Sequence, residues 1–273
     1  MKKILIGGSP CTHWSVIQNA KNREIEASGQ GWELFKNFVI ALHKFKPDYF
    51  IYENNSSIHK NIKKQIENEL NVTLLEIDSQ LVSAQRRKRI YGTNIKGVTV
   101  PEDRGICLQD VLEYGETDRK KSKTVRVGGS GSGWGNKHEW DMPNKDRVYT
   151  TTELERLQTL PDGYTRGIPE RQRRKSLGNG WTAEVIIELM QHMNIDKDEE
   201  IIVVSLYDGI ATGRYCLEKL GFTNVKYFAF EIDKYAMQVA VNNYPDIIEC
   251  GDAFKVRAEK WCIEEELEQD AGN

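Results

Sequence analysis

Residues 201–213 read IIVVSLYDGIATG, an apolar run that ends in a glycine-bearing turn. The run predicts a buried strand at 201–207, and the residues behind the turn predict a helix at 214–220. Such a turn places backbone N–H groups at a helix N-terminus, where they can face a nucleotide cofactor. The elements expected next are a strand at 225–230, a helix at 234–243 and a strand at 247–250. This part of the chain therefore predicts a βαβαβ unit with a ligand site at its strand ends.

The first part of the chain carries a second unit of the same kind. Apolar runs alternate there with helical periodicities, at 3–6, 32–45, 49–52, 59–70 and 72–77. Two such units predict one doubly wound, mostly parallel sheet of the α/β class. Between them, Thr152-x-x-Glu155 predicts a capping box that opens a helix, and 182–193 predicts a further helix.

Length and composition indicate a soluble globular protein. The chain has 273 residues, 39% hydrophobic and 29% charged, without an apolar run of the ~20 residues that a membrane span needs. Five cysteines, an odd number without metal-ligand spacing, favour a reduced intracellular protein with no metal site. The net charge is −3, yet residues 82–175 hold 20 Lys and Arg against 13 Asp and Glu. This asymmetry predicts a basic face, with an ordinary solvated surface as the alternative.

Acidic residues follow the next two strands of the C-terminal unit. Glu231 comes directly after the strand at 225–230, and Asp252 follows the strand at 247–250. A carboxylate at the first position can accept ribose hydroxyls, and one at the second can accept an adenine amino group. Ordinary α/β loops with polar ends are the alternative interpretation.

A second set of chemically active residues follows the strands of the N-terminal unit. Cys11 lies in the loop Gly-Ser-Pro-Cys after the first strand, Glu53 ends the strand at 49–52, and the run 85–89 reads QRRKR. A loop cysteine near positive charge can act as a nucleophile. The alternatives are a small buried hydrophobe for Cys11, a surface carboxylate for Glu53 and a solvated charge run for 85–89.

Gly-Ser-Pro-Cys at 8–11, Glu-Asn at 53–54 and Gln85-x-Arg87-x-Arg89 resemble ordered motifs of the DNA cytosine-5 methyltransferases. Further matching segments are 153–165, 178–181, 208–213, Glu231 and 251–252. The resemblance covers the chain apart from its Gly-rich lobe. The wording of the motifs is most similar to the de novo (Dnmt3-like) branch and its phage and bacterial relatives.

The resemblance implies a Rossmann-like, S-adenosylmethionine-dependent methyltransferase fold. Cys11 would add as a thiolate to C6 of a cytosine, Glu53 would hydrogen-bond N3 and the exocyclic amine, and Arg87 and Arg89 would hold O2 and a neighbouring phosphate. C5 would then take the methyl group, and β-elimination would release Cys11. Because C5 and C6 are hidden in stacked duplex DNA, the target base would be flipped out.

The same resemblance implies two sets of binding residues. S-adenosylmethionine would be bound by Tyr207, Asp208, Gly209, Ile210, Ala211, Thr212, Gly213, Glu231, Ile232, Asp252, Ala253, Asn179, Gly180 and Trp181. Within this set the Ile210 carbonyl would meet the methionine part, Glu231 the ribose and Asp252 the adenine. Double-stranded DNA would be bound by Ser9, Pro10, Ser15, Asn54, Arg119, Lys120, Lys121, Lys123 and Arg126.

Two features depart from the family pattern. The family usually begins with its cofactor motif, whereas here that motif comes last, as a circular permutation would place it. Asn55 stands where the family usually has Val, with Glu53 and Asn54 intact. The expected organisation is a catalytic part of the core at 1–94, a small irregular target-recognition lobe at 95–149, core helices closing the cofactor pocket at 150–193, a permutation linker at 194–200 and the cofactor-binding part of the same core at 201–273.

Other functions stay open at this point. An RNA (tRNA) cytosine-5 methyltransferase would share the fold, and so would a catalytically silent DNA-binding homologue, although intact Cys11 and Glu53 argue against the latter. A nicotinamide-dependent oxidoreductase would share the glycine turn but would not need these two residues. The resemblance leaves room for a homodimer and for a cognate restriction enzyme as partners. It implies the cytoplasm of a bacterium or phage-infected cell, without a membrane partner.

Overall fold

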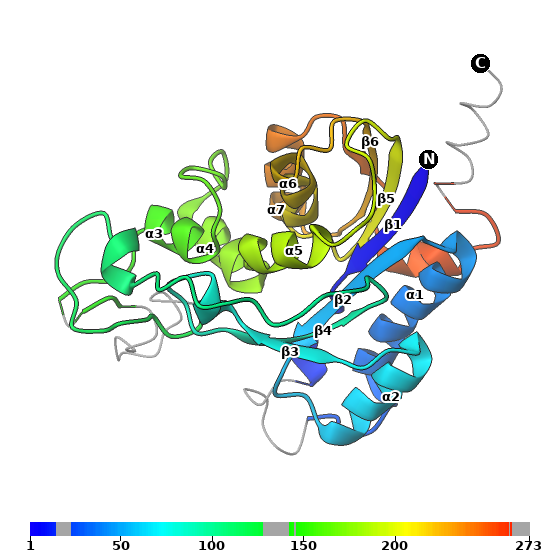
Figure 1. Cartoon of the computed structure of the whole chain (residues 1–273), viewed down its shortest axis with the longest axis horizontal. Helices are drawn as coiled ribbons and strands as arrows, with labels where there is room; N and C mark the ends of the chain where they lie inside the picture. The colour runs from blue at the N-terminus through cyan, green and yellow to red at the C-terminus, as the bar shows by residue number, and fades with distance from the viewer. Residues whose placement is uncertain (15–22, 128–141, 145, 262, 264–273) are drawn as a thin grey trace.

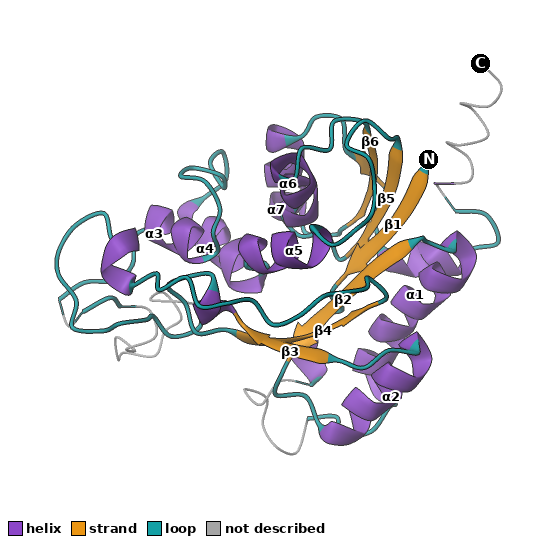
Figure 2. Ribbon diagram, viewed as in Figure 1, coloured by secondary structure: helices purple, strands orange, loops and turns teal. Residues whose placement is uncertain are grey.

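The computed structural model describes residues 1–14, 23–127, 142–144, 146–261 and 263. Within these residues seven strands form one sheet, in the order β3-β4-β2-β1-β5-β6-β7 (Figure 1; Figure 2). The strands are β1 (Lys2–Gly7), β2 (Tyr49–Asn55), β3 (Leu75–Asp78), β4 (Lys88–Thr93), β5 (Ile201–Leu206), β6 (Val225–Phe230) and β7 (Ile248–Glu249). The predicted α/β class with a Rossmann-like sheet is confirmed.

β1 lies at the centre of this sheet and joins the two halves of the chain. It pairs in parallel with β2 on one side and with β5 on the other. The register with β5 runs from Lys2 opposite Ile201 to Gly7 opposite Leu206. The first strand therefore lies beside the strand that leads to the glycine turn, and the two predicted units form one sheet. β4 runs antiparallel to both β2 and β3, so the sheet is mostly parallel with one reversed strand near an edge.

Helices cover both faces of the sheet. They are α1 (Gly29–Phe45), α2 (Lys60–Leu70), α3 (Thr151–Leu157), α4 (Glu170–Asn179), α5 (Ala183–Met190), α6 (Thr212–Lys219) and α7 (Lys234–Asn243). Figure 1 shows α1 and α2 on one face and α5, α6 and α7 on the other. Alternate residues of β1 feed the two cores: Leu5 packs with α1, whereas Ile4 and Ile6 pack toward α5 and α6.

α1 shows why the N-terminal unit folds as predicted. Its apolar side chains recur at helical spacing, and Phe35 and Phe38 are fully buried. Their rings both lie 5.1 Å from the ring of Tyr52 on β2. The helix ends at Lys46, whose φ of 48° breaks the helical path and returns the chain toward β2. This packing fixes the carboxyl end of β2, where Glu53 lies.

The structure corrects the sequence analysis in the middle of the chain. The capping box is formed by Thr150 and Glu153, two residues before the predicted pair, and α3 begins accordingly at Thr151. β4 and α4 are elements that the sequence analysis does not predict. α4 is polar almost throughout, so it carries no apolar periodicity to reveal it.

The oxidation state of the cysteines differs from the prediction, and part of the predicted lobe lies outside the described residues. Cys11, Cys107 and Cys216 are free, but Cys250 is disulfide-bonded, contrary to the expectation of reduced cysteines throughout. The Gly-rich stretch 128–135 lies outside the described residues. Among the described helices, none has the length and apolar character needed to cross a bilayer.

A compensating pair of substitutions tests the contact between the two halves. A Cβ at Gly213, on α6, would lie 2.2 Å from Ile6 Cδ1 and 2.8 Å from the Tyr227 hydroxyl. We expect Gly213→Ala to lower the free energy of unfolding by about 1–3 kcal/mol through overpacking. Because Ile6→Val removes that Cδ1 methyl, the double variant should lose less stability than the sum of the two single losses. Chemical denaturation measures all three variants, and strictly additive losses would contradict the contact.

Candidate active site

The loop that follows β1 carries Cys11 and is fixed from β2. Asn54 Nδ2 donates to the Ser9 carbonyl at 3.0 Å and contacts Ser9 Oγ at 3.2 Å. Ser9 Oγ also lies 2.8 Å from the Tyr52 hydroxyl. Ser9 and Asn54 are buried, so in this structure they shape the loop, whereas the sequence analysis predicts that they contact DNA. Cys11 itself is half-buried at the start of a short 3₁₀ turn.

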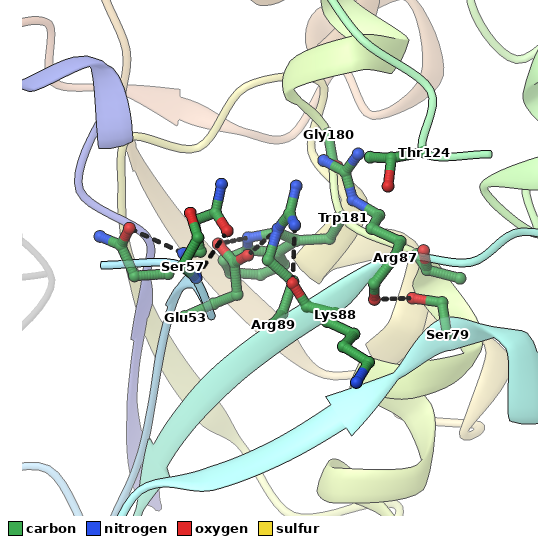
Figure 3. A network of polar contacts seen from close by, with 12 residues as sticks. Glu53, Ser57, Ser79, Arg87, Lys88, Arg89, Thr124, Gly180 and Trp181 are labelled. Carbon is green, nitrogen blue, oxygen red and sulfur yellow. Dashed lines mark hydrogen bonds and ion pairs between the residues drawn. The ribbon is translucent and has the colours of Figure 1, made fainter. Parts of the chain in front are cut away.

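Glu53, at the carboxyl end of β2, is held from two sides (Figure 3). Arg89 Nε lies 3.0 Å from Oε1, and Trp181 Nε1 donates to Oε2 at 3.1 Å. The side chains of Glu53 and Arg89 are only 12% and 13% exposed. A Cβ at Gly8 would come within 2.8 Å of Oε2, so this glycine lets the carboxylate lie against the Cys11 loop. A carboxylate, a guanidinium and an indole from three separate segments therefore meet beside the predicted nucleophile.

Arg87 is placed differently from its neighbour on β4. It is 4% exposed, and its guanidinium donates to the carbonyls of Val125 at 2.9 Å, Gly178 at 3.1 Å and Gly180 at 2.9 Å. Burial, with a contribution from Arg89, lowers the pKa of Arg87 to about 9. In this structure the side chain holds two segments of backbone together. Its predicted contact with substrate stays a prediction.

The pKa of the Cys11 thiol is subject to opposing effects. Burial raises its pKa above the ordinary value, and the Glu53 carboxylate adds to that rise. The positive charges of Arg89 and Arg87 act in the opposite direction but do not outweigh these two causes. The protein without substrate therefore favours the thiol over the thiolate.

The segment that links α4 to α5 brings Trp181 to this site. Asn179 ends α4 with an exposed side chain. The Gly180 carbonyl accepts from both Arg87 and Gln158. The sequence analysis places Trp181 in a cofactor pocket, and the structure shows its indole N–H on Glu53.

The glycine turn at 207–213 has an unusual backbone. Tyr207, Gly209 and Ala211 have φ values of 59°, 65° and 58°, in the left-handed region. The Tyr207 hydroxyl donates to the Leu34 carbonyl of α1 at 2.7 Å, so its side chain anchors the turn to that helix. A Cβ at Gly209 would meet nothing within 4 Å, which leaves open space over the middle of the turn.

The second half of the turn faces a buried tyrosine. The Tyr164 hydroxyl lies 2.9 Å from the Ile210 carbonyl and 3.2 Å from the Ala211 carbonyl. The sequence analysis assigns the Ile210 carbonyl to the methionine part of a cofactor, but here it accepts from protein. Thr212 and Gly213 begin α6 and are buried.

The two acidic strand ends differ in what they hold. Glu231 Oε2 accepts from the Gly209 backbone N–H at 2.9 Å, and its Oε1 accepts from the next two N–H groups after it. Ile232 is 74% exposed beside it. Asp252 is exposed and caps the 3₁₀ turn η5 (Ala253–Arg257), of which Ala253 is buried. An exposed apolar side chain next to an acidic strand end suits a flat ring attached to a sugar.

A third carboxylate, Glu249 on β7, lies at the same edge. It stands opposite Ala229 in the register, and both of its carboxylate oxygens are buried without a hydrogen-bond partner in the described part of the chain. Burial raises the pKa of Glu249 to about 7, and the negative charges of Asp208 and Glu231 contribute. Burial likewise raises the pKa of Asp208 to about 6, although the Tyr227 hydroxyl donates to it at 2.6 Å. Burial and mutual repulsion therefore disfavour the charged forms of both carboxylates.

The basic residues of the lobe do not all reach solvent. Lys121 is 8% exposed, and its ammonium contacts the carbonyls of Gln80 and Ser83. It therefore joins the lobe to the core and is not presented to a nucleic acid, unlike the sequence prediction. Members of the predicted DNA-contact set with at least partial exposure are Pro10, Arg119, Lys120, Lys123 and Arg126, while Ser15 lies outside the described residues.

Sequence reasoning assigns no individual role to Gln158, Tyr164 or Glu249. Gln158 is fully buried, and its Nε2 donates to the Leu177 carbonyl at 2.6 Å. The available signal was a polar residue directly after the apolar positions of α3. For Glu249, the signal was a charge inside a strand pattern.

Comparison with known proteins finds similarity to part of this chain. Residues 1–97 match the family model described as C-5 cytosine-specific DNA methylase. A solved structure of a DNMT2 mutant from Spodoptera frugiperda is similar over 70% of this chain and 79% of that chain, with 17% identity and a TM-score of 0.46. The matched segment contains Cys11, Glu53, Arg87 and Arg89.

Glu249 offers a test of the electrostatics of this edge. Since its pKa is higher in the folded than in the unfolded protein, the folded state binds more protons, and stability falls as pH rises from about 4.5 to about 7. We expect Glu249→Gln to raise the free energy of unfolding at pH 8 by about 1–2 kcal/mol, a figure reduced for solvent screening of a half-buried group.

At pH 4.5 the same substitution should have little effect. Denaturation at both pH values measures the difference. The control is Glu76→Gln on β3, the same substitution at a side chain that is 48% exposed. Equal effects of Glu249→Gln at both pH values would contradict the buried-charge account.

Proposed function

We propose that this protein transfers a methyl group from S-adenosylmethionine to C5 of a flipped-out cytosine in double-stranded DNA. The observation that carries the proposal is Glu53, held by Arg89 and Trp181 against the Cys11 loop. The family match over residues 1–97 supports methyl transfer to cytosine C5. The glycine turn leaves the sheet from the strand next to Cys11, so the nucleophile and the proposed cofactor site share one edge.

The residues at this edge fit S-adenosylmethionine. The open space over Gly209 leaves room for the ligand, Glu231 can receive ribose hydroxyls, and Ile232 offers an apolar surface to the adenine. Glu249 and Asp208 interact electrostatically with Glu231, so a positive charge brought to this edge would favour their ionised forms. When bound, this cofactor supplies a methyl group on a positively charged sulfur.

The chain's own residues supply the rest of the chemistry. The Cys11 sulfur forms a bond to C6 of the cytosine, which makes C5 nucleophilic enough to take the methyl group. Glu53, fixed by Arg89, hydrogen-bonds the base at N3 and its amino group and stabilises the charge that develops on the ring. Loss of the C5 proton to a base then drives β-elimination, which breaks the sulfur–C6 bond and releases Cys11 as the thiolate. A proton held between N3 and Glu53 balances the negative charge that the Cys11 thiolate brings to the ring.

DNA is favoured as the substrate by the name of the matching family, and RNA is the outcome that a substrate test must exclude. Partly exposed Arg119, Lys123 and Arg126, with exposed Lys120, supply positive charge near the lobe for phosphate contacts. The proposal also includes three features that the resemblance implies: flipping of the target base, a cytoplasmic location and a restriction enzyme as partner.

The proposal includes a circular permutation relative to the Dnmt3-like branch. Its support is spatial: the Trp261 ring lies 6.3 Å from the Phe45 ring, and Lys3 Nζ lies 3.5 Å from the Phe45 carbonyl. The segment after the cofactor half thus comes back to the start of β1. At the other junction, the Lys2 backbone N–H donates to the Glu200 carbonyl at 2.9 Å.

Removal of the nucleophile tests the mechanism. We expect Cys11→Ala to reduce methyl transfer by at least about a thousandfold while leaving S-adenosylmethionine affinity within about twofold, because the cofactor turn lies on another strand. Duplex DNA, tRNA and labelled cofactor serve for the transfer assay, and calorimetry for binding. Cys107→Ala, which removes a free thiol from the lobe, is the matched control and should retain full activity.

The wild type should also form a covalent adduct on duplex DNA that contains 5-fluorocytosine, since fluorine at C5 blocks the elimination step. Transfer to tRNA but not to DNA would replace the proposed substrate. The covalent mechanism would be contradicted by near-normal turnover of Cys11→Ala, or by the absence of an adduct in the presence of cofactor.

Reordering the chain tests the permutation. Residues 201–273 placed ahead of residue 1 through a short linker should give a protein with the same fold and with activity within a few fold of the original. The physical reason is that the β1–β5 pairing does not depend on which strand comes first in the chain. Circular dichroism and methyl transfer are the measurements. A reordered chain that cannot fold would show that 194–200 is more than a tether.

A further inference from the structure

Tyr164 contacts the second half of the glycine turn through its hydroxyl. Its hydroxyl lies 2.9 Å from the Ile210 carbonyl and 3.2 Å from the Ala211 carbonyl, and the residue is only 5% exposed. Tyr164 lies in the loop that follows α3, 46 residues before Ile210 in the sequence. A long-range buried hydroxyl therefore meets two successive carbonyls of the proposed cofactor turn.

The turn needs such support because its backbone is strained. Tyr207 and Ala211 have φ values of 59° and 58°, which residues with a Cβ rarely adopt. Ala211 is also the N-cap residue of α6 and makes no side-chain cap. Its conformation must be stabilised by neighbours, and the hydroxyl of Tyr164 is placed to do so.

Tyr164 is itself held rigidly. The fully buried Glu155 accepts from the backbone N–H groups of Gly163 at 2.6 Å and Thr165 at 2.8 Å, one residue on each side of Tyr164. Asn243 Nδ2, on α7, donates to the Tyr164 carbonyl at 3.0 Å.

The ring of Tyr164 packs edge-on against Tyr215 of α6, with centroids 5.6 Å apart. A tyrosine that served only to fill the core would not need its hydroxyl directed at strained backbone. A Cβ at Gly209 would meet nothing within 4 Å, so the middle of the turn stays open for a ligand.

We propose that Tyr164 is a positioning residue that holds the turn at 207–213 in the conformation that binds the nucleoside cofactor, without touching the cofactor. This inference rests on the proposed function. It assigns a role to a tyrosine in the segment between α3 and α4, and it makes cofactor affinity depend on a hydroxyl remote from the ligand.

The test is Tyr164→Phe, which keeps the ring and its packing and removes the hydroxyl. Calorimetry with S-adenosylmethionine should show affinity about 5- to 15-fold weaker, the effect of one buried hydrogen bond. The single-turnover methyl-transfer rate at saturating cofactor should stay within about twofold of the wild type. Tyr215→Phe is the matched control, because its ring packs on Tyr164 while its hydroxyl is not on the turn carbonyls.

A rescue experiment separates positioning from simple packing. Glycine adopts positive φ freely, so Ala211→Gly added to Tyr164→Phe should recover most of the lost affinity. Hydrogen exchange of the ligand-free protein gives a second measurement: amides of 207–213 should exchange faster in Tyr164→Phe and slow again in the double variant.

Three results decide between the hypotheses. Wild-type affinity in Tyr164→Phe, whatever its melting temperature, would overturn the positioning role. Weaker binding without rescue by Ala211→Gly and without faster exchange at the turn would also overturn it, and would indicate a packing defect. A wild-type protein that does not bind S-adenosylmethionine would instead contradict the proposed function, since the positioning inference concerns only differences between variants.

Discussion

The parallel pairing of β1 with β5 is the constraint on which the rest of the structure depends. Six consecutive residues of each strand are in register, at the centre of the sheet. Alternate residues on both strands point into the two cores, so a slip by one residue would turn every buried side chain to the wrong face. This pairing fixes the loop of Cys11 relative to the glycine turn. It does so through hydrogen bonds and packing, neither of which depends on the order of the two halves in the chain.

Glu53 shows how a reactive group is fixed by elements far apart in sequence. β4 supplies Arg89, the segment after α4 supplies Trp181, and Gly8 leaves the space in which the carboxylate lies. A half-buried carboxylate with both oxygens engaged has little freedom to rotate, which keeps its remaining lone pairs directed at a fixed point. The sequence analysis assigns the same indole to the cofactor site, and in the structure its N–H is engaged by Glu53.

The sequence predicts elements best where burial alone determines them. β6 and α7 match their predicted ranges because an apolar strand and an amphipathic helix have patterns of their own. α4 is not predicted, because its buried residues are only Ser176, Leu177 and Gly178, too few to give a helical hydrophobic periodicity. The directions of side chains are predicted less well than the helices and strands. Which carbonyls Arg87 meets, or where the Trp181 indole points, depends on segments about 40 to over 120 residues away, and no local pattern encodes it.

The buried guanidinium of Arg87 raises the question of why the fold keeps so costly a group. Isolated, it would be strongly destabilising, but it satisfies carbonyls from the lobe and from the segment after α4 at once. Gly178 brings these segments together, since a Cβ there would lie 2.5 Å from the Arg126 and Val127 backbone. The lobe is thus clamped to the segment that ends in Trp181. Val125 and Glu53 are thus connected through Arg87, Gly180 and Trp181 by a chain of contacts that joins the lobe to the carboxyl end of β2.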